Sequence, residues 1–251
     1  MQDNQVNIQR YEEDEIDLRE LFKTLMRNKL KIVVITSMIT FGAIIYAYAV
    51  PKVYEAKVIL KIGEYKLANA NANANANANI TSASELSKEL EILFIDILKN
   101  TKDREARISK VGLVNNQQNF IEISSIGVSN NTAISEIDNV VTHLVESHVK
   151  ILDNIKEFRE NKIKDLESKI LIKSDDLFRY ENQLDRLKFI SLPHNYKYTS
   201  IVGNIMTNDH PIKPKKKLIV VVAFVTGLIL SIFFVFFMEF IKGFKDKEKE
   251  A

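Results

Sequence analysis

"HPIKPKKKLIVVVAFVTGLILSIFFVFF", residues 210–237, joins a short segment with two prolines and four lysines to a long apolar run. Residues 218–238 carry no charged side chain, and roughly 20 apolar residues are enough to cross a ~30 Å hydrocarbon core as a helix. A second uncharged run covers residues 32–50, and tyrosines near its end suit a membrane interface. The sequence therefore predicts two membrane helices with a large segment between them.

The two predicted spans define the topology except for its orientation. Both tails, residues 1–31 and 239–251, must lie on one side of the membrane, and residues 51–217 must lie on the other. Within about 15 residues of the span ends, lysine and arginine number nine in the tails and seven in the central segment, which favours cytoplasmic tails. A polar tail precedes the first span and no small-residue cleavage site follows it, so we expect an uncleaved anchor.

The composition argues against several classes of protein. A hydrophobic share of 46% and a charged share of 27% are typical of a folded chain, and a net charge of +2 gives no general attraction to nucleic acid. The seven glycines lie far apart, so the chain has no phosphate-binding or dinucleotide-binding loop. His143 and His148 do not share a helix face, and the chain has no cysteine and no HExxH motif. We therefore expect a protein that is not an enzyme and needs no cofactor or metal.

The regions next to the membrane are predicted to be ordered. Residues 12–31 repeat apolar side chains at helical spacing, so we expect an amphipathic helix that leads into the first span. Residues 53–63, "VYEAKVILKIG", alternate apolar and polar side chains and predict a half-buried strand. Residues 198–207 predict a last strand before the second span. A strand that leaves one membrane helix and a strand that enters the other are expected to pair.

The segment between these strands alternates helix and strand signals. Residues 68–79 are six Ala-Asn repeats, which favour neither helix nor strand and predict a flexible loop, with a self-pairing polar patch as the alternative. Ser82 and Glu85 form a capping-box pattern that opens a helix over residues 82–99. Residues 120–128 again predict a strand, and the Asn130-Asn131 pair offers a cap for a longer helix.

A long helix is predicted over residues 132–190, which contain neither proline nor glycine. At 1.5 Å per residue it would form a rod of roughly 90 Å. Apolar residues recur at intervals of three and four, which is typical of a coiled-coil seam. The predicted oligomer or rod seam consists of Ile163, Leu166, Ile170, Leu177, Leu184 and Leu187. The upstream repeat is displaced, so a stutter near Arg159 or a break near Arg159 or Ser174 is an alternative to an uninterrupted rod.

Three stretches resemble the chain length determinant family, the Wzz-type polysaccharide co-polymerases of bacterial inner membranes. They are the tail "EIDLRELFKTLMRNK", the strand "PKVYEAKVILKIG" and the segment "PIKPKKKLIVVVAFVTGLILS". In the last of these, Pro211 and Pro214 match the family's prolines, and Lys215, Lys216 and Lys217 form the basic stretch beside them. The resemblance covers about the first 65 and the last 50 residues. The Ala-Asn repeat and the short central segment depart from the family pattern.

The resemblance implies an α+β membrane protein in which two transmembrane helices flank a periplasmic α/β base with a long protruding helix. It also implies a homo-oligomer that sets the length of O-antigen or a related surface glycan. The implied partners are a Wzy-type membrane polymerase, the lipid-linked glycan and the bilayer. The lysines are expected to anchor the chain at the outer leaflet, or additionally to contact the pyrophosphate of the lipid-linked glycan or the polymerase.

Two other functions compete with this interpretation. One is the adaptor of a tyrosine-kinase system that exports capsule or exopolysaccharide, and the other is a generic membrane-anchored coiled-coil tether.

Overall fold

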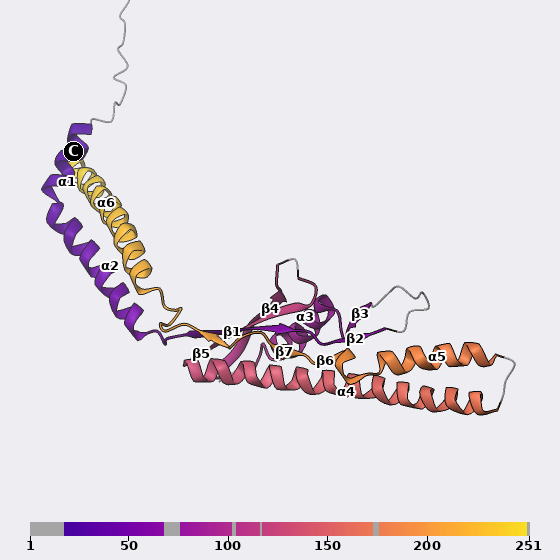
Figure 1. Ribbon diagram of the computed structural model, residues 1–251. Helices are drawn as coiled ribbons and strands as arrows, with labels where there is room; N and C mark the ends of the chain where they lie inside the picture. Colours follow the sequence, from indigo (N-terminus) through magenta and orange to yellow (C-terminus); the bar gives the residue numbers. More distant parts are fainter. Residues whose placement is uncertain (1–17, 68–75, 102–103, 116, 173–175, 250–251) are drawn as a thin grey trace, which may run out of the picture. The chain divides into compact units, whose positions relative to one another are not determined.

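The computed structural model describes residues 18–67, 76–101, 104–115, 117–172 and 176–249 (Figure 1). The chain divides into two units. The first combines Met1–Val50 with Lys215–Ala251, and the second is Pro51–Pro214. Mixed helix and sheet, together with two candidate membrane helices and a long helix, agree with the predicted α+β fold class.

The first unit consists of helices. Helix α1 (Leu18–Arg27) confirms the described part of the predicted tail helix, and α2 (Lys29–Ala49) follows it. Helix α6 (Lys216–Lys249) packs along α2 (Figure 1). Both α2 and α6 are long and apolar enough to cross a membrane. Helix α2 stops where Val50 turns extended, because the proline that follows disfavours the helical conformation.

The main sheet of the second unit is antiparallel and has the strand order β4-β5-β1-β7. Its short strands are β7 (Ser200–Ile201) and β8 (Met206–Thr207), and β8 also pairs with β1. Its long strands are β1 (Tyr54–Lys61), β4 (Ala106–Leu113) and β5 (Phe120–Gly127). The predicted strands at residues 53–63 and 120–128 are thus confirmed, whereas β4 was not predicted. Its sequence, ARISKVGL, interrupts the alternation, and a register irregularity lies between Ile108 and Lys110.

The last strand before the second span is divided in two. Strands β7 (Ser200–Ile201) and β8 (Met206–Thr207) both pair with β1, as the sequence predicted for this part of the chain. Between them, Gly203 has a φ of 76°, a left-handed conformation that glycine adopts easily. This turn separates the two pairings with β1.

A smaller sheet has the order β3-β2-β6, formed by β2 (Glu64–Lys66), β3 (Asn77–Asn79) and β6 (Tyr196–Lys197). The expectation of a loop over the whole Ala-Asn repeat is therefore wrong at Asn77–Asn79, and residues 68–75 lie outside the described residues. Asn77 donates to the Glu64 carboxylate at 3.2 Å, and Asn79 donates to Asn119 at 2.7 Å. These hydrogen bonds outweigh the low strand propensity of the repeat.

Two helices close the core on the sheet. The cap predicted at Ser82 is present, because its hydroxyl accepts from the Glu85 N–H at 3.2 Å and starts α3 (Ala83–Glu91). A π-helical turn, η1 (Ile92–Asp96), follows α3. The second helix is α4 (Asn130–Leu171). The core contains side chains from β1, β4, β5, α3 and α4, including Ala56, Val58, Leu60, Leu86, Leu90, Ile121, Ile123, Ile137, Val140 and Leu144.

The predicted single rod is instead two helices, α4 (Asn130–Leu171) and α5 (Leu177–Ile190), which pack side by side (Figure 1). The break near Ser174 is therefore the alternative that agrees with the helix bounds, and α4 continues without interruption through Arg159. Residues 173–175 lie outside the described residues. The cap of α4 is Ser129, which exchanges hydrogen bonds with Thr132, rather than the predicted Asn130-Asn131 pair.

Candidate functional site

The proline-lysine motif lies where the chain passes from the second unit into the first. Before the boundary, the Ile212 N–H donates to the Val53 carbonyl at 2.8 Å, and the Val53 N–H donates to the Lys213 carbonyl at 3.0 Å. These bonds hold the start of the central unit and its last residues side by side. Pro211 and Pro214 are both half-buried. Proline cannot donate a backbone hydrogen bond, so both residues favour the extended chain that precedes α6.

The lysines that follow the boundary belong to the start of α6. The Lys215 carbonyl accepts from the Ile219 N–H at 3.1 Å, which starts the helical pattern. Lys215 and Lys217 are exposed, whereas Lys216 is half-buried, with its Nζ 3.8 Å from the centroid of the Tyr48 ring. This cation–π contact fixes one lysine against the end of α2, and the other two are accessible to an anionic partner.

The pair α2 and α6 has polar side chains at its contact. The Thr36 and Ser231 hydroxyls lie 3.1 Å apart, and both residues are buried. A Cβ built at Gly227 would approach Ile39 to 3.3 Å, so the helix backbones come close there. In the same unit, Arg27 at the end of α1 forms an ion pair with Glu239 on α6. Small residues and interhelical hydrogen bonds are the contacts that associate helices within a bilayer.

Arg159 connects four elements of the central unit and is only 5% exposed. Its Nη1 donates to the Ile190 carbonyl and to the Tyr196 hydroxyl, each at 2.9 Å, and its Nη2 donates to the Lys66 carbonyl. Its guanidinium also lies 5.1 Å from the centroid of the Tyr196 ring. Among the described residues no carboxylate pairs with Arg159, so backbone and phenol oxygens satisfy a buried positive charge. The helical spacing had indicated this position only as a possible stutter.

His148 has a structural setting that the sequence did not indicate. Its Nδ1 lies 2.6 Å from the Thr199 Oγ1, which in turn accepts from the Gly63 N–H at 2.9 Å. The imidazole tautomer decides which of the two atoms, His148 Nδ1 or Thr199 Oγ1, donates in this hydrogen bond. Burial lowers the pKa of His148 below its ordinary value of 6.5. His143 packs edge-on against the Phe94 ring instead, so the structure does not bring the two histidines together.

The predicted seam residues lie on both helices of the α4–α5 pair. Leu166 is buried, Ile163, Ile170, Leu184 and Leu187 are half-buried, and Leu177 is 37% exposed at the start of α5. An ion pair of 2.8 Å between Lys188 and Glu167 joins the two helices. Packing of α5 on α4 thus accounts for much of the seam within one chain. A role of these residues in oligomer contacts stays a prediction.

The described residues contain no cluster of three or more histidine and acidic side chains that could hold a metal ion. Asp153, Asp165 and Glu167 of α4 form ordinary surface pairs instead. Asp165 lies 2.9 Å from Lys169 and 3.3 Å from Lys162, and hydrogen bonds from these two lysines lower its pKa. Such solvated pairs are typical of an exposed helix face.

Comparison with known proteins covers both ends of the chain. The model of the family "Wzz: Chain length determinant protein" matches residues 14–111, and the model "G-rich domain on putative tyrosine kinase" matches residues 195–240. Among curated proteins, none matches.

A solved structure described as a full-length bacterial polysaccharide co-polymerase has the same fold, with a TM-score of 0.56. It is 16% identical in sequence, and the match covers 92% of this chain and 99% of that one. At this identity the likeness concerns the fold. The family model supplies the independent sequence match, and it includes the tail, the first span and β1. Both comparisons agree with the predicted resemblance: residues 14–111 match the chain length determinant family, and the fold is that of a bacterial polysaccharide co-polymerase.

Proposed function

We propose that the protein regulates the length of a surface polysaccharide, O-antigen or a related glycan, without catalysing its synthesis. The match of the chain length determinant model to residues 14–111 carries this proposal. The fold shared with a bacterial polysaccharide co-polymerase supports it. In this role the protein acts as a homo-oligomer in the inner membrane, together with a Wzy-type polymerase that extends the lipid-linked glycan.

The topology that we propose follows the sequence boundaries. Residues 1–31 and 239–251 form cytoplasmic tails, residues 32–50 and 218–238 span the membrane, and residues 51–217 form the periplasmic domain. Helices α2 and α6 fit a two-pass protein of the inner membrane. A single cysteine introduced by Lys110→Cys tests the orientation, because the natural chain has no cysteine. Lys110 is exposed, whereas the neighbouring sheet position Ser125 is buried and would label poorly.

The decisive experiment deletes the gene and separates the surface polysaccharide by length on a gel. The proposal predicts that the deletion strain loses its modal length and that the wild-type gene restores it. A ladder with an unchanged length distribution would refute the regulator and would favour a generic tether.

The lysines at the start of α6 are proposed to act on the glycan or the polymerase as well as to anchor the chain. Replacing Lys215, Lys216 and Lys217 by glutamine is expected to shift the modal length while the protein still inserts in the membrane. The matched control replaces Lys242, Lys245 and Lys247 in the other membrane-flanking region. An unchanged length in the first variant would leave these lysines with anchoring alone.

A second candidate is an adaptor for a tyrosine kinase that controls export of capsule or exopolysaccharide. The match of residues 195–240 to the G-rich domain on putative tyrosine kinase favours it specifically. The two functions differ in what deletion changes. An adaptor predicts a loss of phosphotyrosine on a partner kinase together with reduced export, whereas the length regulator predicts a redistribution of lengths without a change in phosphotyrosine.

A further inference from the structure

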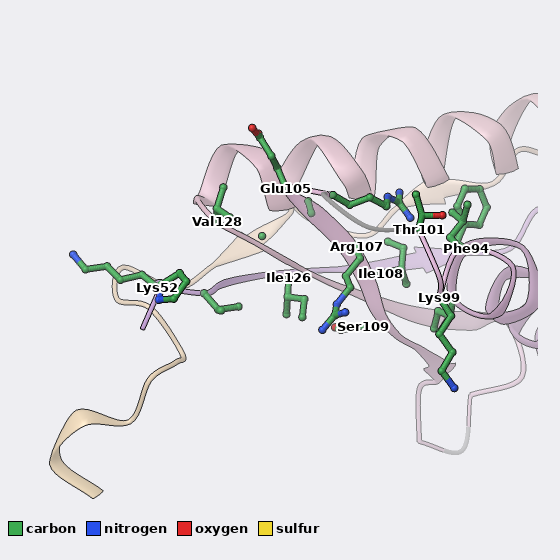
Figure 2. Close-up of a pocket in the computed structure, with 17 residues that line it drawn as sticks. Lys52, Phe94, Lys99, Thr101, Glu105, Arg107, Ile108, Ser109, Ile126 and Val128 are labelled. Atoms are coloured by element: carbon green, nitrogen blue, oxygen red, sulfur yellow. The ribbon is translucent and has the colours of Figure 1, made fainter. Parts of the chain in front are cut away.

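A groove of about 770 Å³ lies at one end of the main sheet (Figure 2). At this end β1 and β4 begin and β5 finishes, because Gly127 pairs with Tyr54 on one side and with Ala106 on the other. The segment that follows α3, including Phe94 and Lys99, forms another part of the wall. A concave site of this volume is large enough to hold a small ligand.

Three exposed cations line the groove: Lys52, Lys99 and Arg107. Figure 2 shows Lys52 and Lys99 at opposite ends with Arg107 between them. None of the three pairs with a carboxylate among the described residues. Positive charge in a groove without internal neutralisation attracts an anion and concentrates it there.

The other charged residues of the groove do not neutralise these cations. Arg104 is already paired with Glu136 at 2.6 Å. Glu105 is exposed, and its side chain points away from Arg107 in Figure 2. On the adjoining strand, Glu55 lies 3.5 Å from Lys57 and is paired to it. Among the described residues that line it, the groove therefore has an excess of positive charge.

Apolar side chains accompany the central cation. Arg107 on β4 is directly opposite Ile126 on β5, so both side chains project from the same face of the sheet. Phe94, Ile95 and Leu98 add further apolar surface. A guanidinium beside apolar side chains suits a ligand that carries a phosphate on a partly apolar body, because arginine binds phosphate with two parallel hydrogen bonds.

Lys52, at one end of the groove, follows the first candidate membrane helix closely in the chain. Helix α2 ends at Ala49, and Lys52 lies two residues after its cap, Val50, within a reach of about 7 Å along the chain. A ligand at the membrane surface is therefore within reach of Lys52 at this end of the groove. We propose that this groove binds the phosphate headgroup of an anionic membrane lipid, with Arg107 as the direct phosphate contact. This inference does not depend on the role in chain length.

Amide hydrogen exchange of the full-length protein in nanodiscs tests the proposal. The reporters are the amides of residues 104–109, in the part of β4 that lines the groove. Nanodiscs of neutral phosphatidylcholine are compared with nanodiscs that contain increasing fractions of phosphatidylglycerol. The proposal predicts slower exchange with phosphatidylglycerol, and Arg107→Gln should raise the fraction that gives half of the effect by about tenfold.

Lys110→Gln is the matched control, because it removes the same charge from the same strand outside the groove. It should respond to phosphatidylglycerol as the wild type does. The amides of β5 report whether each variant is folded, and Arg107→Lys provides a second variant that keeps the charge and loses the paired hydrogen bonds. An equal response in the wild type and in Arg107→Gln would overturn the proposal, as would an equal loss in Lys110→Gln.

Soluble glucose 1-phosphate, added to phosphatidylcholine nanodiscs, distinguishes the source of the phosphate. The proposal predicts that it leaves the exchange of residues 104–109 unchanged. Slower exchange with glucose 1-phosphate, combined with no effect of phosphatidylglycerol, would overturn a lipid ligand and assign the groove to a soluble sugar phosphate.

Discussion

Apolar residues recur at helical spacing in both the first half of α4, residues 130–150, and the second half, residues 151–171. The two halves pack against different elements. In the first half, Ile137, Val140 and Leu144 are buried against the main sheet. In the second half, Leu166 is buried beside α5, while Leu171 at the end of the helix is 83% exposed. A helical stripe of apolar residues thus shows that a surface is covered, but it does not show whether a sheet, a helix of the same chain or another protein covers it.

The largest effect is expected from the half that packs on the sheet. Leu144→Ala removes a side chain that is 2% exposed and should lower the free energy of unfolding by about 3 kcal/mol, because the surrounding core fills the cavity only in part. Thermal or denaturant unfolding of the purified protein measures this loss. Leu171→Ala is the control, and a similar loss there would contradict the difference between the two halves.

Arg159 lies on α4 between Leu144 and Leu166 and should give the next largest effect. Arg159→Met leaves the Ile190 and Lys66 carbonyls without their donor, which should lower the free energy of unfolding by about 2 kcal/mol. Arg179→Met, at an exposed position of α5, is the control and should change it by less than about 0.5 kcal/mol. Equal unfolding midpoints for the two variants would show that the buried guanidinium does not connect these elements.

His148 is expected to make the first half sensitive to pH. The native protein holds this imidazole neutral, because burial lowers its pKa below 6.5, whereas the unfolded chain takes up a proton near that value. Stability should therefore be complete above pH 6.5 and should decrease as the pH falls through the folded pKa. The unfolding temperature, measured in steps from pH 7.5 to pH 5.5, checks the sign.

His148→Gln should flatten this dependence, while His194→Gln, at an exposed position, should leave it in place. A wild-type protein that becomes more stable on acidification over this range would contradict the neutral histidine.

The smallest effect is expected at the surface of the second half. The pair between Lys188 and Glu167 is about half-exposed on both sides, so Lys188→Ala should lower the free energy of unfolding by about 0.5 kcal/mol or less. A double-mutant cycle with Glu167→Ala measures the coupling between the two residues. A coupling as large as the Leu144→Ala effect would mean that the distal helices depend on this pair rather than on the seam.

Much of the fold was predictable because it depends on local patterns. The two spans, the alternating strand β1 and the cap at Ser82 each have a signal within a short stretch of sequence. The division of the rod was less predictable, since residues 172–176 contain neither proline nor glycine. Strand β3 was missed because its pairing depends on Glu64 and Asn119, which are distant in the sequence.

The candidate site was predictable only where its residues are contiguous. The proline-lysine motif is visible in seven consecutive residues, 211–217. In the sequence, Arg159 and His148 look like ordinary residues of a helix. Their hydrogen bonds are made to Tyr196 and Thr199, which are 37 and 51 residues further along the chain. The groove is likewise assembled from three separated segments, so no local pattern indicates it.

The pairing of α4 with α5 in one chain is tested most directly by chemical crosslinking. The natural chain has no cysteine, so Glu167→Cys and Lys188→Cys introduce the only two thiols, at positions whose native side chains lie 2.8 Å apart. A short bis-maleimide, applied to the full-length protein in membranes, should join the two cysteines within one chain and produce a monomer of altered mobility on a denaturing gel. Crosslinked dimers in place of that monomer would contradict the account and assign the seam to contacts between protomers.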